Sequence, residues 1–279
     1  MKQLYQKYKP HYQSSLHLAI PVVISQLGHT LVHTADSVII GHFVGTTALA
    51  AVSLVNSIFT IVLVIGIGIS YGLTPLIAQE NGKKEYSECG RLLSNSLLIN
   101  AISGILLYAL VYFGSVAVID HLDQSAEVVK QAKPYLNLLG FSIIPLMIFM
   151  TFKQFAEGLG FTRQAMMISI WGNVLNVCLG IIFVKGLFGI EPMGIQSVGW
   201  STLIDRSIMA VVMTVYVLRS ENFRKYLKSF ALKSVDLLRS VNIIRIGAPV
   251  AMQYTFEVSA FSGAAIMIGT IGAVHQAAH

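Results

Sequence analysis

Residues 18–53 read LAIPVVISQLGHTLVHTADSVIIGHFVGTTALAAVS, a membrane-length apolar segment that carries one acidic residue, Asp36. A helix needs about 20 apolar residues to cross the hydrocarbon core of a bilayer. An ionisable side chain within such a helix is costly unless it faces the interior of a helix bundle or a water-filled cavity. The segment therefore predicts a membrane helix with Asp36 at a functional site. The alternative is an acid near the outer helix end that only hydrogen-bonds to its neighbours.

A second segment near the C-terminus repeats the layout of the first. It covers residues 245–279 and reads RIGAPVAMQYTFEVSAFSGAAIMIGTIGAVHQAAH. Pro249 and Gly269 keep the spacing of 20 residues that separates Pro21 from Gly41, and Glu257 lies between them. Few aligned residues are identical, so the evidence for a repeat is this spacing and the presence of an acid in each copy.

The composition is that of a membrane protein. Charged residues make up 11% of the 279 residues and hydrophobic residues 54%, whereas soluble domains carry about 25% charged residues. A chain of this length has room for about six to eight spans joined by short loops. The formal net charge of +6 does not indicate nucleic-acid binding if the basic residues gather in loops on one side of a membrane.

Uncharged windows locate the spans. Residues 37–79 hold no charged residue, which is enough for the end of one helix, a short turn and a complete second helix. Apolar runs of this length argue against a β-barrel, whose strands alternate over about 10 residues. We predict seven membrane helices, at residues about 15–41, 53–79, 92–119, 134–155, 164–185, 197–219 and 243–269.

Lysine and arginine are concentrated in alternate loops. The N-terminus and the loops that follow the second, fourth and sixth predicted helices hold 15 of the 19 basic residues. Because cytoplasmic loops retain positive charge, the N-terminus is predicted to be cytoplasmic.

A long basic segment separates six predicted helices from the seventh. We divide the chain into a six-helix transmembrane lobe at 1–218, a basic cytoplasmic linker at 219–242, and the first helix of an incomplete second lobe at 243–279. The linker is amphipathic in places and could lie along the inner leaflet. Since the opening pattern returns after the linker, we expect a C-terminally truncated part of a longer protein; pairing of two such chains is the alternative.

The first helix carries a polar stripe at spacings of three and four residues, which places its members on one face. The stripe consists of Gln26, His29, His33, Asp36 and Ser37. Asp36 could bind Na⁺ through its carboxylate, or it could take up and release a proton. The two histidines could line a cavity, relay protons or hydrogen-bond across the bundle. A zinc site is a weaker interpretation because no further ligand is evident.

The fifth predicted helix carries Ser169, Asn173, Asn176 and Gly180 on one face. Asparagine offers a neutral carbonyl oxygen that suits a hard cation. Hydrogen bonding between helices is an equally good interpretation of these residues.

Three further sets of charged residues lie in or beside the spans. In the sixth helix, Ser201 and Thr202 precede Asp205 and Arg206, and we expect this adjacent acid and base to form a structural pair. In the seventh helix, Glu257 lies one turn after Gln253, and at that depth a transport role is favoured over a structural hydrogen bond. Near the end of the fourth helix, Lys153 and Glu157 are expected to form a surface pair.

The sequence holds little that indicates an enzyme. Gly66, Gly68 and Gly72 do not follow a strand and lack dinucleotide-binding spacing, so we interpret them as sites of close helix packing. No nucleophile elbow, P-loop, HExxH or CxxC motif is present. We therefore expect no enzymatic activity and no cofactor apart from a coupling ion.

Several motifs together resemble one family of membrane proteins. They are Pro21, Asp36-Ser37, Gly41 and Gly45 in the first span, QFAEGLGFTR at 154–163, GNVLN at 172–176, GWSTLI at 199–204 and APVAMQYTFEVSAF at 248–261. In order and spacing they resemble the multidrug and toxic compound extrusion (MATE) transporters, in particular the NorM-like branch.

The resemblance implies an all-α antiporter of two six-helix lobes that rock about a central cavity, monomeric in its full-length form. Influx of Na⁺ or H⁺ would drive export of cationic amphipathic compounds through the plasma membrane. The implied cation-coupling residues are Asp36, Asn173, Asn176, Thr202 and Glu257, with Gln26, His29, His33 and Gln253 as cavity-lining candidates. Some relatives place a second acid where this chain has Gly180.

Two other functions remain open. A flippase for a lipid-linked precursor, as in the same superfamily, would typically have several basic residues in its cavity, and the sequence offers only Arg206. A membrane protein that does not transport is the other alternative.

Overall fold

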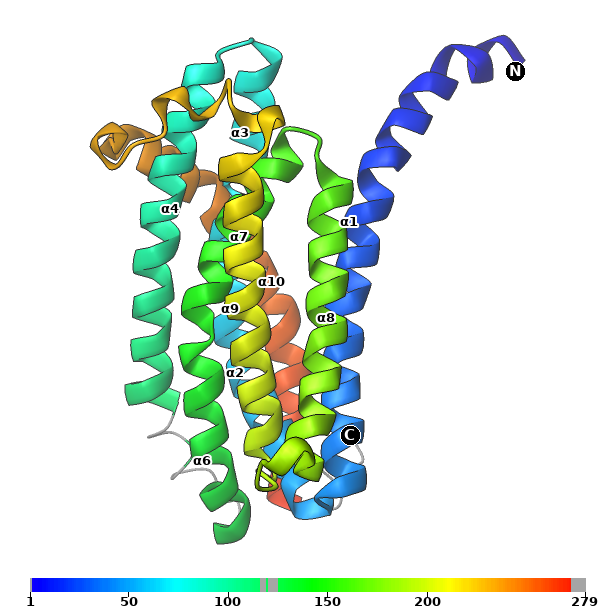
Figure 1. Cartoon of the computed structure of the whole chain (residues 1–279), viewed down its shortest axis with the longest axis vertical. Coiled ribbons are helices and arrows are strands. Elements are labelled where there is room, and N and C mark those ends of the chain that lie inside the picture. Colours follow the sequence, from blue (N-terminus) through cyan, green and yellow to red (C-terminus); the bar gives the residue numbers. More distant parts are fainter. Residues whose placement is uncertain (1, 116–118, 120–124, 272–279) are drawn as a thin grey trace.

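The computed structural model describes residues 2–115, 119 and 125–271, and these residues form helices and turns without a strand. Figure 1 shows an elongated bundle in which the first part of α1 extends away from the other helices. The long helices are α1 (Lys2–Phe43), α2 (Thr46–Tyr71), α3 (Leu73–Gly82), α4 (Tyr86–Ala109), α6 (Ala126–Phe141), α7 (Ile143–Gly158), α8 (Thr162–Lys185), α9 (Gln196–Arg219) and α10 (Leu237–Ile271). A short π-helix, η1 (Leu110–Ser115), continues α4.

The predicted all-α membrane fold is confirmed. Within the described part of the chain, six helical segments are long and apolar enough to cross a membrane. They match the first six predicted spans, and α10 contains the seventh. Some boundaries were wrong. The fourth span begins at Ala126 and not at residue 134, because the helix also includes Glu127, Lys130 and Lys133, which the uncharged window leaves out. Residues 272–279 of the predicted third unit lie outside the described residues.

Two of the spans are interrupted in the same way. Gly72 separates α2 from α3 and Ser142 separates α6 from α7, and in each case a proline follows three residues later, Pro75 and Pro145. Proline has no N–H, and its ring clashes with the carbonyl four residues before it, which is the last residue of the preceding helix. The interruptions therefore follow from the positions of the prolines. The second one leaves the Ser142 side chain buried next to the cavity described below.

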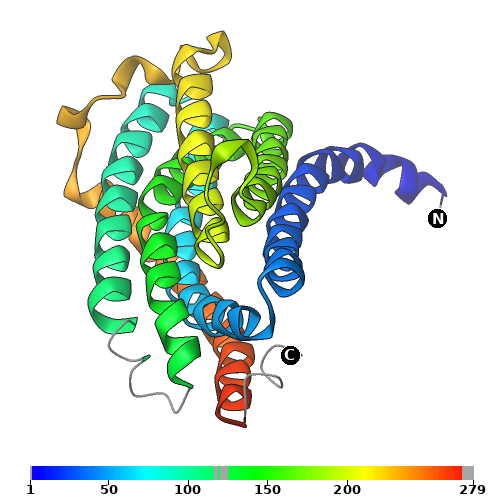
Figure 2. The same ribbon diagram turned by 60° about the horizontal axis from the view of Figure 1, so that its bottom comes forward.

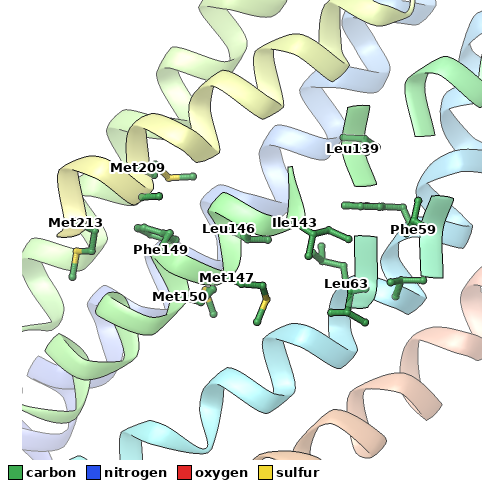
Figure 3. Packing of buried hydrophobic residues seen from close by; sticks show 14 of the residues in the cluster. Phe59, Leu63, Leu139, Ile143, Leu146, Met147, Phe149, Met150, Met209 and Met213 are labelled. Carbon is green, nitrogen blue, oxygen red and sulfur yellow. The ribbon is translucent and has the colours of Figure 1, made fainter. Parts of the chain in front are cut away.

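The apolar core lies mainly between α2, α4, α6, α7 and α9, and Figure 3 shows part of it. Phe59 and Leu63 of α2 face Ile143, Leu146 and Met147 of α7, as Figure 3 shows. Met209 and Met213 of α9 lie near Phe149 on another side of α7. Because α7 also packs against α3 and α4, it is the central helix of the bundle.

Helices α2 and α10 are in backbone contact through small residues. A Cβ atom added to Gly72 would lie 2.2 Å from the carbonyl oxygen of Ile243, and one added to Gly247 would lie 2.5 Å from that of Ile69. At Gly68 the added atom would lie 2.3 Å from the Cα of Ala251. Small residues four apart allow membrane helices to approach this closely. The predicted packing role of these glycines is confirmed, and α10 is held against the six-helix lobe.

The linker forms three short 3₁₀ turns, η3 (Glu221–Phe223), η4 (Leu227–Ser229) and η5 (Leu232–Ser234). The first lies beside α9, and the other two lie beside α4. Figure 2 shows this segment beside one end of the bundle. The Asn95 Oδ1 atom accepts hydrogen bonds from the Asp236 N–H at 2.8 Å and the Ser240 hydroxyl at 3.0 Å. Arg239 donates to Glu88 through two nitrogens, which holds the pKa of the guanidinium above its ordinary value. The linker is thus attached to α4.

Substitution of Gly247 tests the contact between α2 and α10. We expect Gly247→Leu to lower the free energy of unfolding by about 1–3 kcal/mol, because the added side chain overlaps the α2 backbone. Gly263→Leu, on the same helix, is the matched control, since a Cβ there meets no atom of the described residues within 4 Å. Thermal unfolding of both variants in one detergent measures the difference, and equal midpoints would contradict the close contact.

Candidate functional site

A cavity of about 190 Å³ lies between α1, α2, α7, α8 and α9. One wall is apolar and includes Leu63, Ile67, Leu146 and Met150. The polar side chains that line the cavity are Gln26, His29, Thr30, His33, Asp36, Thr60, Tyr71, Lys153, Asn173, Asn176, Thr202, Asp205 and Arg206. Residues of five helices, far apart in the sequence, are therefore brought to one chamber inside the bundle.

Asp36 is the acid that α1 contributes to this cavity. Its side chain is only 3% exposed, and its Oδ1 atom has no hydrogen-bond partner in the described part of the chain. Gln26, His29 and His33 line the same cavity, as the spacing predicts. Ser37 does not, because its hydroxyl donates to the His33 carbonyl at 3.0 Å. The face of α1 that points into the bundle is thus polar, and it presents a buried carboxylate without a donor.

Helix α8 contributes two asparagines. The Asn176 Nδ2 atom donates to the Thr202 hydroxyl of α9 at 3.1 Å, while Asn176 Oδ1 has no partner among the described residues. A Cβ on Gly28 would lie 2.5 Å from Asn173 Nδ2, so the glycine in α1 makes room for this amide. Ser169 hydrogen-bonds within α8 to the Ala165 carbonyl at 3.0 Å and does not line the cavity.

The expected structural pair of Asp205 and Arg206 is not formed. Consecutive residues of a helix point about 100° apart, and the two side chains take different partners. Arg206 donates from Nη1 to the Ser142 hydroxyl at 2.7 Å and lies 5.4 Å from the centre of the Phe59 ring. Asp205 Oδ1 has no hydrogen-bond partner among the residues described. Both are buried and both line the cavity.

Lys153 and Glu157 are not the surface pair that the sequence predicts. Lys153 is 3% exposed, its Nζ lies 3.9 Å from Glu157 Oε1, and it donates to the Ser25 hydroxyl at 3.3 Å. The prediction was wrong because it ended the span near residue 155, whereas α7 continues to Gly158 inside the bundle. Lys153 is a cavity residue that sequence reasoning missed. The sequence did hold a signal for this position, namely two opposite charges four residues apart directly after a long apolar run.

Two predicted site residues lie elsewhere. Gln253 and Glu257 are exposed on α10 and do not line this cavity, contrary to the expectation of a buried carboxylate at residue 257. Helix α10 comes near the cavity at Tyr254. The ring centre of Tyr254 lies 6.1 Å from that of Tyr71, which lines the cavity. The role of Glu257 as a coupling acid stays a prediction.

The ligand set of the cavity favours a hard cation. No group of three or more His, Cys, Asp or Glu side chains in the described ranges is arranged to hold a metal ion. Hard cations take carboxylate, amide carbonyl and hydroxyl oxygens together. Asp36, Asn176 and Thr202 offer one of each beside the cavity.

Comparisons with known proteins agree on one family. A family model described as MatE matches residues 21–182. The chain is 30% identical over 272 residues to the multidrug resistance protein NorM of Photobacterium profundum, covering 98% of this chain and 59% of the relative. It is 31% identical over 277 residues to the multidrug resistance protein MdtK of Yersinia pestis, covering 98% and 60%. The chain thus spans about three fifths of the length of these relatives.

Solved structures share the fold. An inward-facing multidrug resistance MATE transporter superposes with a TM-score of 0.81 at 20% identity, over 95% of this chain and 59% of that one. The eukaryotic MATE transporter AtDTX14 gives 0.84 at 16% identity, over 94% and 57%.

The buried Lys153–Glu157 pair generates a stability prediction. We expect Lys153→Met to lower the free energy of unfolding by about 3 kcal/mol, because it leaves a buried carboxylate without its cation. The double variant Lys153→Met with Glu157→Gln removes that charge and should recover most of the loss. Thermal unfolding in detergent measures both, and a double variant as unstable as the single one would argue that the pair is not buried.

Proposed function

The chain belongs to the MatE family, and on that premise we propose that it acts in secondary active export of small molecules, driven by influx of Na⁺ or H⁺. The helices that could span a membrane and the family together make it a multi-pass membrane protein. The relatives named as multidrug resistance proteins support the export of varied compounds. The single observation that carries the proposal is the Asp36 carboxylate, which is buried beside the cavity and whose Oδ1 atom accepts no hydrogen bond from the described residues.

In this proposal the coupling ion binds at Asp36, with Asn173, Asn176 and Thr202 as neutral neighbours. A buried charge without a partner is unstable in a medium of low dielectric constant, so the carboxylate favours either a bound Na⁺ or a proton. Loss of the ion leaves the negative charge uncompensated until another cation replaces it. Ion and cationic substrate then compete for one charge, which is the requirement for exchange across the membrane.

The apolar wall of the cavity supports an amphipathic substrate. Ligand sites commonly combine apolar walls with a few polar groups that fix orientation. Here Leu63, Ile67 and Met150 lie opposite the polar face of α1 in one cavity. We propose cationic amphipathic compounds as the substrate class, with the charged group toward Asp36 and the apolar part toward α2 and α7.

The cavity also favours a second candidate function. Lys153 joins Arg206 on its wall, so two basic side chains are present where the sequence indicated one. Such residues suit the phosphate groups of a lipid-linked precursor, as a flippase would require. Two results together would favour the exporter. The chain would export ethidium, and the lipid-linked precursor would have no effect on cation binding.

We propose that the protein lies in the plasma membrane with its N-terminus in the cytoplasm. The concentration of Lys and Arg in alternate loops supports it.

Asp36→Asn tests the coupling assignment. In cells without their own exporters, we expect expression of this chain to cause ethidium efflux, and the substitution to reduce the efflux rate at least about tenfold, because a neutral amide carries no negative charge to attract a cation and cannot take up and release a proton. Glu191→Gln, an exposed acid outside the cavity, is the control and should retain efflux. Equal efflux from Asp36→Asn, or none from the unaltered chain, would count against the proposal.

Reporter fusions test the orientation. A reporter fused after residue 88 should be active as a cytoplasmic fusion, and one fused after residue 126 as an external fusion, because basic loops stay inside. Alkaline phosphatase and green fluorescent protein fusions report the two sides. The reverse pattern would overturn the proposed topology.

A further inference from the structure

A second carboxylate faces the same cavity as Asp36. Asp205 lies on α9, three residues after Thr202, and is 4% exposed. It lines the cavity together with Asp36 and Asn176. Asp205 is therefore placed to act on whatever occupies this cavity.

Three buried acceptor atoms in this cavity have no hydrogen-bond partner in the part of the chain that the structure describes. They are Asp36 Oδ1 of α1, Asn176 Oδ1 of α8 and Asp205 Oδ1 of α9. A buried acceptor without a donor is destabilising, and more so when it is charged. A hard cation satisfies several such oxygens at once, since it takes carboxylate and carbonyl ligands together. The three unpartnered oxygens, each from a different helix, thus indicate a single bound cation.

Helix α8 leaves room for the Asp205 carboxylate. A Cβ on Gly172 would lie 2.6 Å from Asp205 Oδ1 and 2.5 Å from Met209 Sδ. Gly180, two turns later on the same helix, differs because a Cβ there would meet Ile39 Cδ1 at 3.6 Å and the Ser201 hydroxyl at 3.7 Å. These are ordinary contact distances. A side chain at position 172 would therefore displace the Asp205 carboxylate, whereas a methyl group at position 180 would not.

The charges around the cavity limit the charge of its ligand. Two acids, Asp36 and Asp205, face two bases, Lys153 and Arg206. Lys153 has its own counter-ion in Glu157, at 3.9 Å. Arg206 is buried and held by Ser142, so its charge stays beside the two acids. The formal charges of Asp36, Asp205 and Arg206 add up to −1, which one monovalent cation neutralises. A divalent cation would leave an excess positive charge in a poorly solvated interior, where that is costly.

We propose that Asp205 is a second ligating carboxylate of the cation site and that Arg206 restricts the site to a single monovalent cation, with Na⁺ as the representative ion. This inference rests on the proposed coupling at Asp36, and it adds both a ligand and a charge selectivity to that site.

Equilibrium binding of radioactive Na⁺ to the purified full chain in lipid nanodiscs tests the inference. We expect saturable Na⁺ binding by the unaltered chain, and at least about tenfold weaker binding by Asp205→Asn, because one charged ligand is lost. Gly172→Ala should weaken binding as well, although all ligands remain, because its methyl group displaces the Asp205 carboxylate. Gly180→Ala is the matched control on the same helix and should bind Na⁺ as the unaltered chain does.

Competition by Ca²⁺ in the same assay tests the role of Arg206. Arg206→Gln changes the sum of charges from −1 to −2, so we expect Ca²⁺ to displace Na⁺ from this variant at a concentration at least about tenfold lower than from the unaltered chain. An unchanged preference would overturn the charge restriction. Thermal unfolding without Na⁺ identifies any variant that has lost its fold.

The outcomes separate this inference from the proposed function. Wild-type Na⁺ affinity in both Asp205→Asn and Gly172→Ala, with binding lost in Asp36→Asn, would overturn the role of Asp205 and leave coupling at Asp36 in place. Undiminished binding in Asp36→Asn would overturn both. An unaltered chain that binds no Na⁺ while it exports ethidium would overturn the Na⁺ site and leave proton-driven export.

Discussion

A buried carboxylate, one oxygen of which has no hydrogen-bond donor among the residues that the structure describes, is the constraint on which this structure depends. The Asp36 side chain is almost fully buried, and a buried charge is unstable unless something compensates it. The surrounding helices offer neutral oxygens, a second acid and one guanidinium, that of Arg206, so one negative charge is left to be compensated. An exchangeable cation is the compensation that such an arrangement suits, and exchange of that cation is what an antiporter needs.

The packing of the bundle determines how the cavity is enclosed. The central helix α7 lies against α3, α4 and α9, and the prolines that interrupt two spans leave Ser142 at the α6–α7 junction to hold Arg206. On the other side, glycines bring the backbones of α2 and α10 into contact. Because α2 also forms a wall of the cavity, α10 is in direct contact with a helix that lines the site.

The sequence predicted the helices and one side of the site well because both depend on local patterns. Uncharged windows locate spans, and residues three or four apart share a face, which identified Asp36, His29 and His33 on α1. Predictions failed where the answer depends on another helix. Asp205 and Arg206 are adjacent in sequence and line the same cavity, but the Arg206 guanidinium donates to Ser142 and not to Asp205. Lys153 lies inside the bundle and not at its surface. Sequence spacing does not show which helices surround a residue.

By itself, the sequence determined that this is an all-helical membrane protein with an acid inside a span, because the bilayer imposes the length and apolarity of each segment. The tertiary structure alone decided which polar groups share the cavity. Asp205 comes to lie with Asp36 because α1, α8 and α9 meet there, and glycines at positions 28 and 172 leave room for their neighbours' side chains. Such contacts join residues far apart in the chain, and no periodicity within one helix can specify them.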